Sequence, residues 1–224
     1  MPMKHGHHNL GTPTVRPETA RLSADMPGVV AVGLTGSVGA GKSTALSMFA
    51  ELGAAVFSAD EAVHGLYRHP DVCAPLRARF GPVVFAEDGS LDRSALAEIV
   101  LADEDARRWL EDFIHPQVAD EMGRFLRTCP SPTVVVFEVP LLFDSGMERM
   151  FDLTVTIEAG RDVRARRAED PRRRRVFEGF DLKQLPSERR ASLADMAYVN
   201  DGDPEQLRRF VEAAYRRASE CIPA

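Results

Sequence analysis

The sequence predicts an α/β fold with a mostly parallel five-stranded sheet flanked by helices. Apolar runs of strand length alternate with helical patterns along most of the 224 residues, and this alternation is typical of βαβ units. The run at 29–35 is continuously apolar, as expected for a parallel strand buried on both faces. A glycine-rich turn then leads into an amphipathic segment, which indicates a strand, a loop and a helix in that order.

Five strands and several helices are expected in chain order. The strands are 29–35, 54–60, 133–140, 152–159 and a weaker one at 196–199. A helix over 43–52 has its apolar positions on one side and Gly53 just past its end, where glycine commonly terminates helices. Further helical patterns cover 103–114, 116–127, 161–169 and 203–219.

The segment between the second and third expected strands is too long for one crossover helix. It covers about 61–132, whereas a crossover needs only about a dozen residues. We expect an inserted helical lobe over the carboxyl ends of the strands, where open α/β sheets bind ligands. The first 27 residues lack periodicity and predict a mobile tail, so 28–224 is expected to be a single domain.

Composition and charge argue against several classes of function. No apolar run approaches the ~20 residues needed to cross a bilayer. A net charge of −6 argues against general nucleic-acid affinity. Three distant cysteines without metal-binding spacing favour a reducing compartment. We therefore expect a cytoplasmic monomer or weak homo-oligomer without a nucleic-acid or membrane partner.

Residues 36–43 match the phosphate-loop (P-loop) pattern G-x-x-x-x-G-K-[ST] at every fixed position. Glycines let successive backbone N–H groups face one anion, and the following helix N-terminus adds partial positive charge. A turn that merely closes a strand–helix corner is the alternative. Lys42 is expected to reach the β- and γ-phosphates, and the Ser43 hydroxyl to ligate Mg²⁺. The residues expected to bind nucleotide are Gly36, Gly39, Ala40, Gly41, Lys42, Ser43 and Thr44.

The loop alone does not distinguish GTPases, motor ATPases and small-molecule kinases. No N/T-K-x-D motif for reading guanine is present, and the third expected strand offers a single Glu138 before a turn. The size of the chain and its inserted lobe favour a kinase that acts on a small acceptor.

Asp60 ends the second expected strand, which lies next to the phosphate loop in a sheet of this kind. A carboxylate there can accept the proton of an acceptor hydroxyl, or hold that hydroxyl in line with the γ-phosphorus. Asp also favours the N-cap of a helix. Both roles are open at this position.

Several segments together resemble the dephospho-CoA kinase family. They are LTGSVGAGKST, GAAVFSAD, FIHP, VPLLFDSG and LADMAYVNDG, whose order and spacing carry the resemblance over about 29–218. The resemblance implies a P-loop kinase fold and ATP–Mg²⁺-dependent phosphorylation of the 3′-hydroxyl of dephospho-CoA. Asp60 would be the catalytic carboxylate, and Lys42 would stabilise the charge of the transferred group.

The resemblance also implies roles beyond the phosphate loop. His115 would lie near the acceptor, and Asn200 with Gly202 would lie against the adenine of ATP. A packing role for His115 and a plain turn at 200–202 are the alternatives. The arginine-rich run 160–175, with eight arginines and three acids, would belong to a lid over about 164–190, although a solvated basic face is its default interpretation. The lid residues expected to contact phosphates are Arg164, Arg167 and Arg190.

Three positions depart from the family pattern. Ser58 stands where the family usually has Asp, so a supporting role of that carboxylate toward Mg²⁺ or substrate is in doubt here. Asp144 replaces the commoner Glu after PLLF, and the lid keeps only Gln184 of an R-I-x-x-Q pattern.

Two other functions remain open. A nucleoside or nucleoside monophosphate kinase would need arginines in the lobe for a second phosphate, and the lobe holds Arg77, Arg79 and Arg107. A regulatory protein that binds ATP without transferring phosphate is the other possibility.

Overall fold

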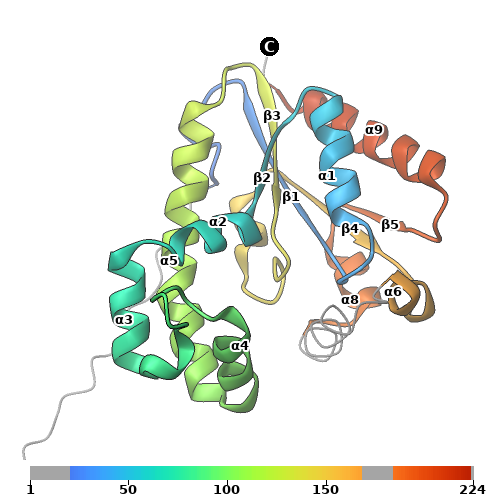
Figure 1. Cartoon of the computed structure of the whole chain (residues 1–224). Coiled ribbons are helices and arrows are strands. Elements are labelled where there is room, and N and C mark those ends of the chain that lie inside the picture. Colours follow the sequence, from blue (N-terminus) through green and yellow to red (C-terminus); the bar gives the residue numbers. More distant parts are fainter. Residues whose placement is uncertain (1–20, 168–183, 223–224) are drawn as a thin grey trace, which may run out of the picture.

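A single five-stranded parallel sheet with the order β2-β3-β1-β4-β5 forms the centre of the protein (Figure 1). The computed structural model describes residues 21–167 and 184–222, to which the structural statements below refer. The strands are β1 (Val29–Gly36), β2 (Ala55–Ser58), β3 (Thr133–Glu138), β4 (Leu153–Glu158) and β5 (Met196–Val199). The predicted fold class is confirmed, because all five expected strands are present and each pairs in parallel.

The register of the strands brings several chemically active positions to one edge of the sheet. Glu138, the last residue of β3, pairs with Leu34 of β1 and with Ser58 of β2. Gly36, at the end of β1, pairs with Ile157 of β4. Because all the strands run in one direction, their carboxyl ends lie together, and the phosphate loop starts from the central strand of this edge.

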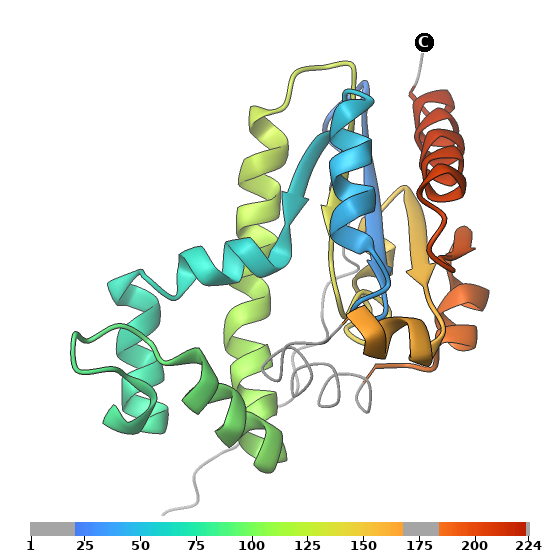
Figure 2. The same ribbon diagram turned by 45° about the vertical axis from the view of Figure 1, so that its right-hand side comes forward.

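Helices cover both faces of the sheet (Figures 1 and 2). Helices α1 (Lys42–Glu51) and α9 (Pro204–Glu220) pack on one face, where Phe49 and Val211 are fully buried against β1. Helix α5 (Glu104–Thr128) covers the opposite face with Met122 and Leu126. Side chains of β1 reach both cores, which explains why its sequence is apolar without alternation.

The chain between β2 and β3 is helical over most of its length. It contains α2 (Ala59–Leu66), α3 (Pro70–Phe80), η1 (Pro82–Val84), α4 (Arg93–Ala102) and α5. Helices α3 and α4 and the first half of α5 extend beyond the carboxyl ends of the strands (Figure 1). The remaining elements are η2 (Met147–Met150), α6 (Arg161–Arg167) and α8 (Ser187–Leu193).

Two local predictions in this region are wrong. The two helices expected at 103–114 and 116–127 form one helix, and Pro116 lies inside it. Ile114 and Val118, on either side of the proline, are both buried in the same core, and the Gln117 side chain donates to the Phe113 carbonyl at 2.9 Å. Shared burial on one face therefore keeps the helix continuous despite the missing N–H group.

The second wrong prediction concerns the end of β2. Asp60 neither ends the strand nor caps a helix, because the strand stops at Ser58 and α2 begins at Ala59. Ser58 is the N-cap, and its hydroxyl accepts a hydrogen bond of 3.4 Å from the Glu61 N–H. Asp60 consequently lies in the first turn of α2.

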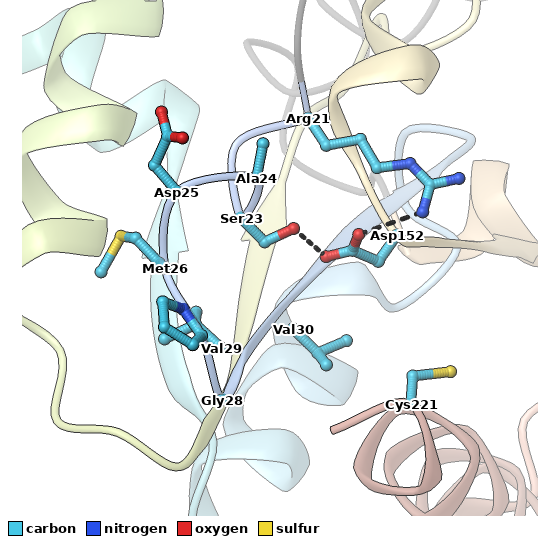
Figure 3. Close-up of a pocket in the computed structure, with 11 residues that line it drawn as sticks. Arg21, Ser23, Ala24, Asp25, Met26, Gly28, Val29, Val30, Asp152 and Cys221 are labelled. Atoms are coloured by element: carbon cyan, nitrogen blue, oxygen red, sulfur yellow. Dashed lines mark hydrogen bonds and ion pairs between the residues drawn. The ribbon is translucent and has the colours of Figure 1, made fainter. Parts of the chain in front are cut away.

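Part of the segment expected as a tail lies against the fold. Residues 1–20 and the lid residues 168–183 are outside the described residues, but the Leu22 N–H donates to the Met150 carbonyl at 2.9 Å. The Ser23 hydroxyl donates to the Asp152 carboxylate at 2.6 Å, and Arg21 also contacts this carboxylate (Figure 3). Within the described residues, no helix is long and apolar enough to span a membrane.

Candidate active site

Two glycines of the phosphate loop are required by the space around them. Gly36 has φ +140°, and a Cβ there would lie 1.9 Å from the Ile157 carbonyl oxygen of β4. Gly41 has φ +105°, and a Cβ there would lie 2.5 Å from the side-chain nitrogen of Asn200. The loop is therefore closely packed from outside, between the end of β1 and the start of α1.

Two side chains from later in the chain hold the outer carbonyl groups of this loop. Asn200, which is buried, donates its side-chain amide to the Ala40 carbonyl at 2.7 Å, and Arg167 donates to the Gly39 carbonyl at 3.0 Å. In a trans peptide the C=O and the next N–H point in opposite directions. The bond from Asn200 thus directs the Gly41 N–H away from Asn200.

Asn200 and Gly202 were expected beside the adenine of ATP. The structure instead gives Asn200 a role within the protein, because its amide supports the phosphate loop and its Oδ1 accepts from the Gly202 N–H at 3.1 Å. Contact with adenine stays a prediction.

Lys42 is the first residue of α1 and directly follows the glycines of the phosphate loop. It is 8% exposed, and its ammonium group donates to the Ser37 carbonyl at 3.1 Å. Burial lowers the pKa of Lys42, whereas the carboxylates of Glu138, Asp60 and Glu158 oppose this shift and Arg190 adds to it. Three acids from different elements therefore surround one lysine.

Asp60, in the first turn of α2, and Glu138, at the end of β3, both act on the charge of Lys42. Asp60 is exposed at the start of α2, whereas Glu138 is buried at the end of β3. Burial raises the pKa of Glu138, with Lys42 opposing the shift and Asp60 and Glu61 adding to it. The Asp60 carboxylate thus acts on the charge of the phosphate-loop lysine, and its catalytic role stays a prediction.

Glu138 is a site residue that the sequence analysis did not identify. Its signal in the sequence is a single acid at the end of an apolar strand, directly before a turn. The pairing of β3 with the central strand β1 gives this position its meaning, because residues at the carboxyl edge beside the phosphate loop face the bound ligand.

A buried ion pair between Arg190 and Glu158 contacts the phosphate loop at Ser37. Arg190 is 2% exposed and binds Glu158 through two bonds, Nε to Oε1 at 2.8 Å and Nη2 to Oε2 at 2.6 Å. Nη2 also donates to the Ser37 hydroxyl at 2.5 Å, and Nη1 contacts the Leu185 carbonyl. Arg190 was expected to contact phosphate, but here its guanidinium connects α8, β4 and the phosphate loop. A phosphate contact stays a prediction.

The other expected site residues lie around this centre. Ser43 and Thr44 are exposed in the first turn of α1. Arg164 is buried and donates through Nε to the Ala159 carbonyl at 3.0 Å. Its backbone lies 3.5 Å from where a Cβ of Gly39 would be. His115 is half-buried in the middle of α5.

Three residues from the comparison with the family pattern, of which Gln184 matches it and Asp144 and Ser58 depart from it, make local contacts. Asp144 accepts a hydrogen bond of 2.8 Å from the Leu185 N–H, and Gln184 donates to the Pro140 carbonyl at 3.0 Å. Both bonds join the segment after β3 to the residues that precede α8. Ser58, in place of an acid, serves as the helix cap described above.

The donor set fits Mg²⁺ bound together with a nucleoside triphosphate. Mg²⁺ prefers oxygen ligands and usually takes one or two carboxylates together with phosphate oxygens and water. The exposed Ser43 hydroxyl and the Glu138 and Asp60 carboxylates supply such oxygens. In residues 21–167 and 184–222, no group of three or more His, Cys, Asp or Glu residues could hold a metal by itself, so the phosphates would complete the site.

Two pockets of the described residues lie away from the phosphate loop. One, of about 460 Å³, is at the amino ends of the strands, opposite the phosphate loop, and is lined by Met26 and Asp152 (Figure 3). The other, of about 350 Å³, is lined by Phe57, Ala62 and Gly65. A helix turns about 100° per residue, so Ala62 and Gly65 face away from Asp60. Neither pocket belongs to the phosphate site.

The chain is similar to proteins of one family along most of its length. The family model described as dephospho-CoA kinase matches residues 30–206. The dephospho-CoA kinase of Aquifex aeolicus is 34% identical over 187 residues, which cover 82% of this chain and 95% of that protein. The dephospho-CoA kinase of Brucella abortus is 36% identical over 188 residues, with 82% and 92% covered.

Solved structures agree with this similarity. The crystal structure of TT1252 from Thermus thermophilus has a TM-score of 0.73 and 29% identity, and the match covers 84% of this chain and 97% of that one. The dephospho-CoA kinase from Campylobacter jejuni, with a TM-score of 0.56, 20% identity and 86% and 99% coverage, supports the fold alone.

Proposed function

The chain belongs to the dephospho-CoA kinase family, and we propose that it transfers the γ-phosphoryl group of ATP to the 3′-hydroxyl of dephospho-CoA. One observation supports the proposed site: the carboxylates of Asp60 and Glu138 both raise the pKa of the buried Lys42, and Lys42 in turn lowers that of Glu138. An acceptor hydroxyl held at Asp60 would therefore face a phosphate held at Lys42.

The geometry suits a reaction that depends on positioning and charge neutralisation. Phosphoryl transfer places negative charge on the oxygens of the transferred group, with the attacking and leaving oxygens roughly in line. Lys42 and the backbone N–H groups of the loop bind these oxygens, while the Asp60 carboxylate orients the ribose hydroxyl and accepts its proton. Mg²⁺, held by Ser43 and Glu138, would supply further positive charge at the β- and γ-phosphates.

The lobe arginines argue against the rival acceptor. A nucleoside monophosphate kinase would use lobe arginines for a second phosphate, but the guanidinium of Arg77 lies 3.9 Å from the centre of the Phe85 ring. Arg79 lies 5.5 Å from the ring of Phe80, and Arg107 pairs with Glu111 at 2.8 Å. These three guanidinium groups are engaged within the lobe, so they give no support to a second phosphate bound by Arg77, Arg79 or Arg107.

A coupled assay of ADP release tests the function. The purified protein is mixed with ATP and Mg²⁺, with and without dephospho-CoA, and parallel reactions contain AMP, CMP or UMP. We expect ADP release that depends on dephospho-CoA, with a product of CoA mass. Equal or faster turnover of a monophosphate would identify that monophosphate as the acceptor in place of dephospho-CoA. If no acceptor increased ADP release, the result would favour a regulatory protein.

We also propose a compartment and an oligomeric state for the protein. Cys73, Cys129 and Cys221 are all free thiols, which fits a reducing cytoplasm. We expect a monomer or weak homo-oligomer, and sedimentation velocity at micromolar concentration measures this state directly.

A further inference from the structure

Asp60 and His64 lie on the same face of α2. They are four residues apart in a helix that covers Ala59–Leu66, so their side chains project one turn apart, ~6 Å along the axis. Both are exposed. A ligand whose hydroxyl binds at Asp60 therefore extends past His64 if it follows this face of the helix.

Arg93 meets His64 from a different helix. It is the first residue of α4, and its Nη1 contacts the His64 Nε2. The preceding residue, Asp92, caps α4, where its Oδ1 accepts from the Ser94 and Ala95 N–H groups at 2.9 and 3.1 Å, and within the described residues it forms no ion pair with Arg93. The Arg93 guanidinium and the His64 imidazole thus meet on the face of α2 that also carries Asp60.

Arg93 makes no ion pair in the part of the chain that the structure describes, whereas several other arginines of the lobe have a carboxylate or an aromatic ring as a partner. Across residues 21–167 and 184–222, no carboxylate lies within 4.0 Å of its guanidinium. The arginines of the lobe with a carboxylate or aromatic partner are Arg77, Arg79, Arg107, Arg108 and Arg124. The charge of Arg93 is therefore available to a ligand.

Tyr67 adds a hydroxyl to the same place. It follows His64 by three residues, so it lies on the same side of the chain, and its burial raises its pKa to about 12 while the Arg93 charge opposes the shift. The Tyr67 hydroxyl consequently stays protonated and can donate a hydrogen bond at neutral pH. Arg93, His64 and Tyr67 together offer donors and no carboxylate.

We propose that His64, Tyr67 and Arg93 bind the diphosphate group of the acceptor, which joins the adenosine and pantetheine parts of dephospho-CoA. The inference rests on the proposed function, because it places the acceptor 3′-hydroxyl at Asp60. On the same ribose the 5′-phosphate is attached through C5′ to the ring carbon next to C3′, so its separation from the 3′-hydroxyl is on the scale of the one helical turn between Asp60 and His64. The planar guanidinium of Arg93 can bind a phosphate through two parallel hydrogen bonds.

The subsite would also reduce the electrostatic repulsion between the protein and its anionic acceptor. The acceptor is an anion, the chain carries a net charge of −6, and Asp60 and Glu61 are acids at the start of α2. Without local positive charge this region would repel the diphosphate. Arg93 contacts His64, one helical turn from Asp60, and its positive charge offsets this repulsion there. The Asp60 carboxylate can then bind the acceptor hydroxyl.

Binding measurements on Arg93 variants test the subsite. Calorimetry gives the Kd of dephospho-CoA and, separately, of ATP for the wild type, Arg93→Ala, Arg93→Lys and His64→Gln. We expect Arg93→Ala to weaken dephospho-CoA binding at least tenfold, Arg93→Lys to fall between it and the wild type, and His64→Gln to weaken it severalfold. The Kd of ATP should stay within twofold in all three.

A matched control separates this role from a general effect of charge in the lobe. Arg108→Ala removes an exposed lobe arginine that pairs with Asp105 at 2.9 Å, and it should leave both Kd values unchanged. His64→Gln changes an exposed side chain, so it keeps the test available if Arg93→Ala unfolds.

The outcomes distinguish this inference from the proposed function. If the wild type phosphorylates dephospho-CoA but the variants bind it with unchanged affinity, the subsite is wrong and the function stands. Equal losses of ATP and dephospho-CoA affinity would indicate a structural role and would also overturn the subsite. If the wild type neither binds nor phosphorylates dephospho-CoA, the function fails and the subsite fails with it.

Discussion

The side-chain amide of Asn200 donates a hydrogen bond of 2.7 Å to the carbonyl oxygen of Ala40, 160 residues earlier in the chain. This bond holds the Ala40–Gly41 peptide from outside the phosphate loop. Because the peptide is planar and trans, it also sets the direction of the Gly41 N–H. Asn200 therefore orients the Gly41 N–H as a donor for the nucleotide without having to contact the nucleotide itself. Preorganised N–H groups stabilise negative charge in other sites in the same way.

Replacing Asn200 should weaken ATP binding as well as lower the free energy of unfolding. Asn200→Asp puts a carboxylate against the Ala40 carbonyl, and we expect the Kd of ATP to rise at least tenfold. Asn200→Ala leaves that buried carbonyl without a partner, and the free energy of unfolding should fall by about 1–3 kcal/mol. Calorimetry with ATP and urea unfolding measure the two effects.

Gln117→Ala is the matched control for Asn200. It also removes a side-chain amide that bonds to a backbone carbonyl, that of Phe113 at 2.9 Å, but in α5. It should leave the Kd of ATP unchanged. If Asn200→Ala left it unchanged as well, the loop would not depend on this bond.

Removing Arg190 should destabilise the protein strongly at neutral pH. Arg190→Met leaves the buried Glu158 without its ion-pair partner, and losing one partner of a buried pair costs about 3–5 kcal/mol. In the exposed pair Arg209–Glu205, at 3.3 Å, the change Arg209→Met should cost ~1 kcal/mol or less. Urea unfolding at pH 7 compares the two variants.

The pH dependence of stability should change sign in the Arg190 variant. Burial raises the pKa of Glu158, but the bonds from Arg190, Ser37 and Thr156 hold it below its ordinary value of 4.5. The wild-type contribution of Glu158 is therefore present above about pH 4.5 and is lost as the pH falls further. Without Arg190 the pKa of Glu158 rises, so lowering the pH from 7 to 5 should restore part of the lost stability. A variant that instead loses stability over this range would contradict the assignment.

Glu138 should be needed for the response to Mg²⁺. Glu138→Gln keeps the size of the side chain but removes its charge beside Lys42, and we expect kcat to fall about a hundredfold while half-maximal activity needs more Mg²⁺. A Mg²⁺ titration of the steady-state rate measures both changes. A lower kcat with an unaltered Mg²⁺ requirement would limit Glu138 to positioning Lys42.

The fold was predictable because its signals are local. The uninterrupted apolar run of β1 and the glycines of residues 36–43 each have one simple structural explanation, and alternation of elements then implies a parallel sheet. Errors arose where tertiary contacts override a local signal. Pro116 looked like a helix boundary, yet burial of the residues on both sides keeps α5 continuous.

The candidate site was predictable only in part. Lys42 and Asp60 follow from a motif and from a position after a strand. The support of the loop by Asn200 and the pairing of Arg190 with Glu158 depend on contacts between residues far apart in the chain, which spacing does not reveal. Glu138 became recognisable only when the strand order placed β3 beside β1.

The most direct test of the account is the single-turnover rate of Asp60→Asn with saturating ATP, Mg²⁺ and dephospho-CoA. Its control is Glu61→Gln, which removes the neighbouring acid of the same helical turn. We predict that Asp60→Asn slows phosphoryl transfer by at least a hundredfold while the Kd of ATP changes by less than threefold, and that Glu61→Gln transfers at nearly the wild-type rate. Transfer by Asp60→Asn within a few-fold of the wild-type rate would contradict the central claim that this carboxylate positions the acceptor hydroxyl.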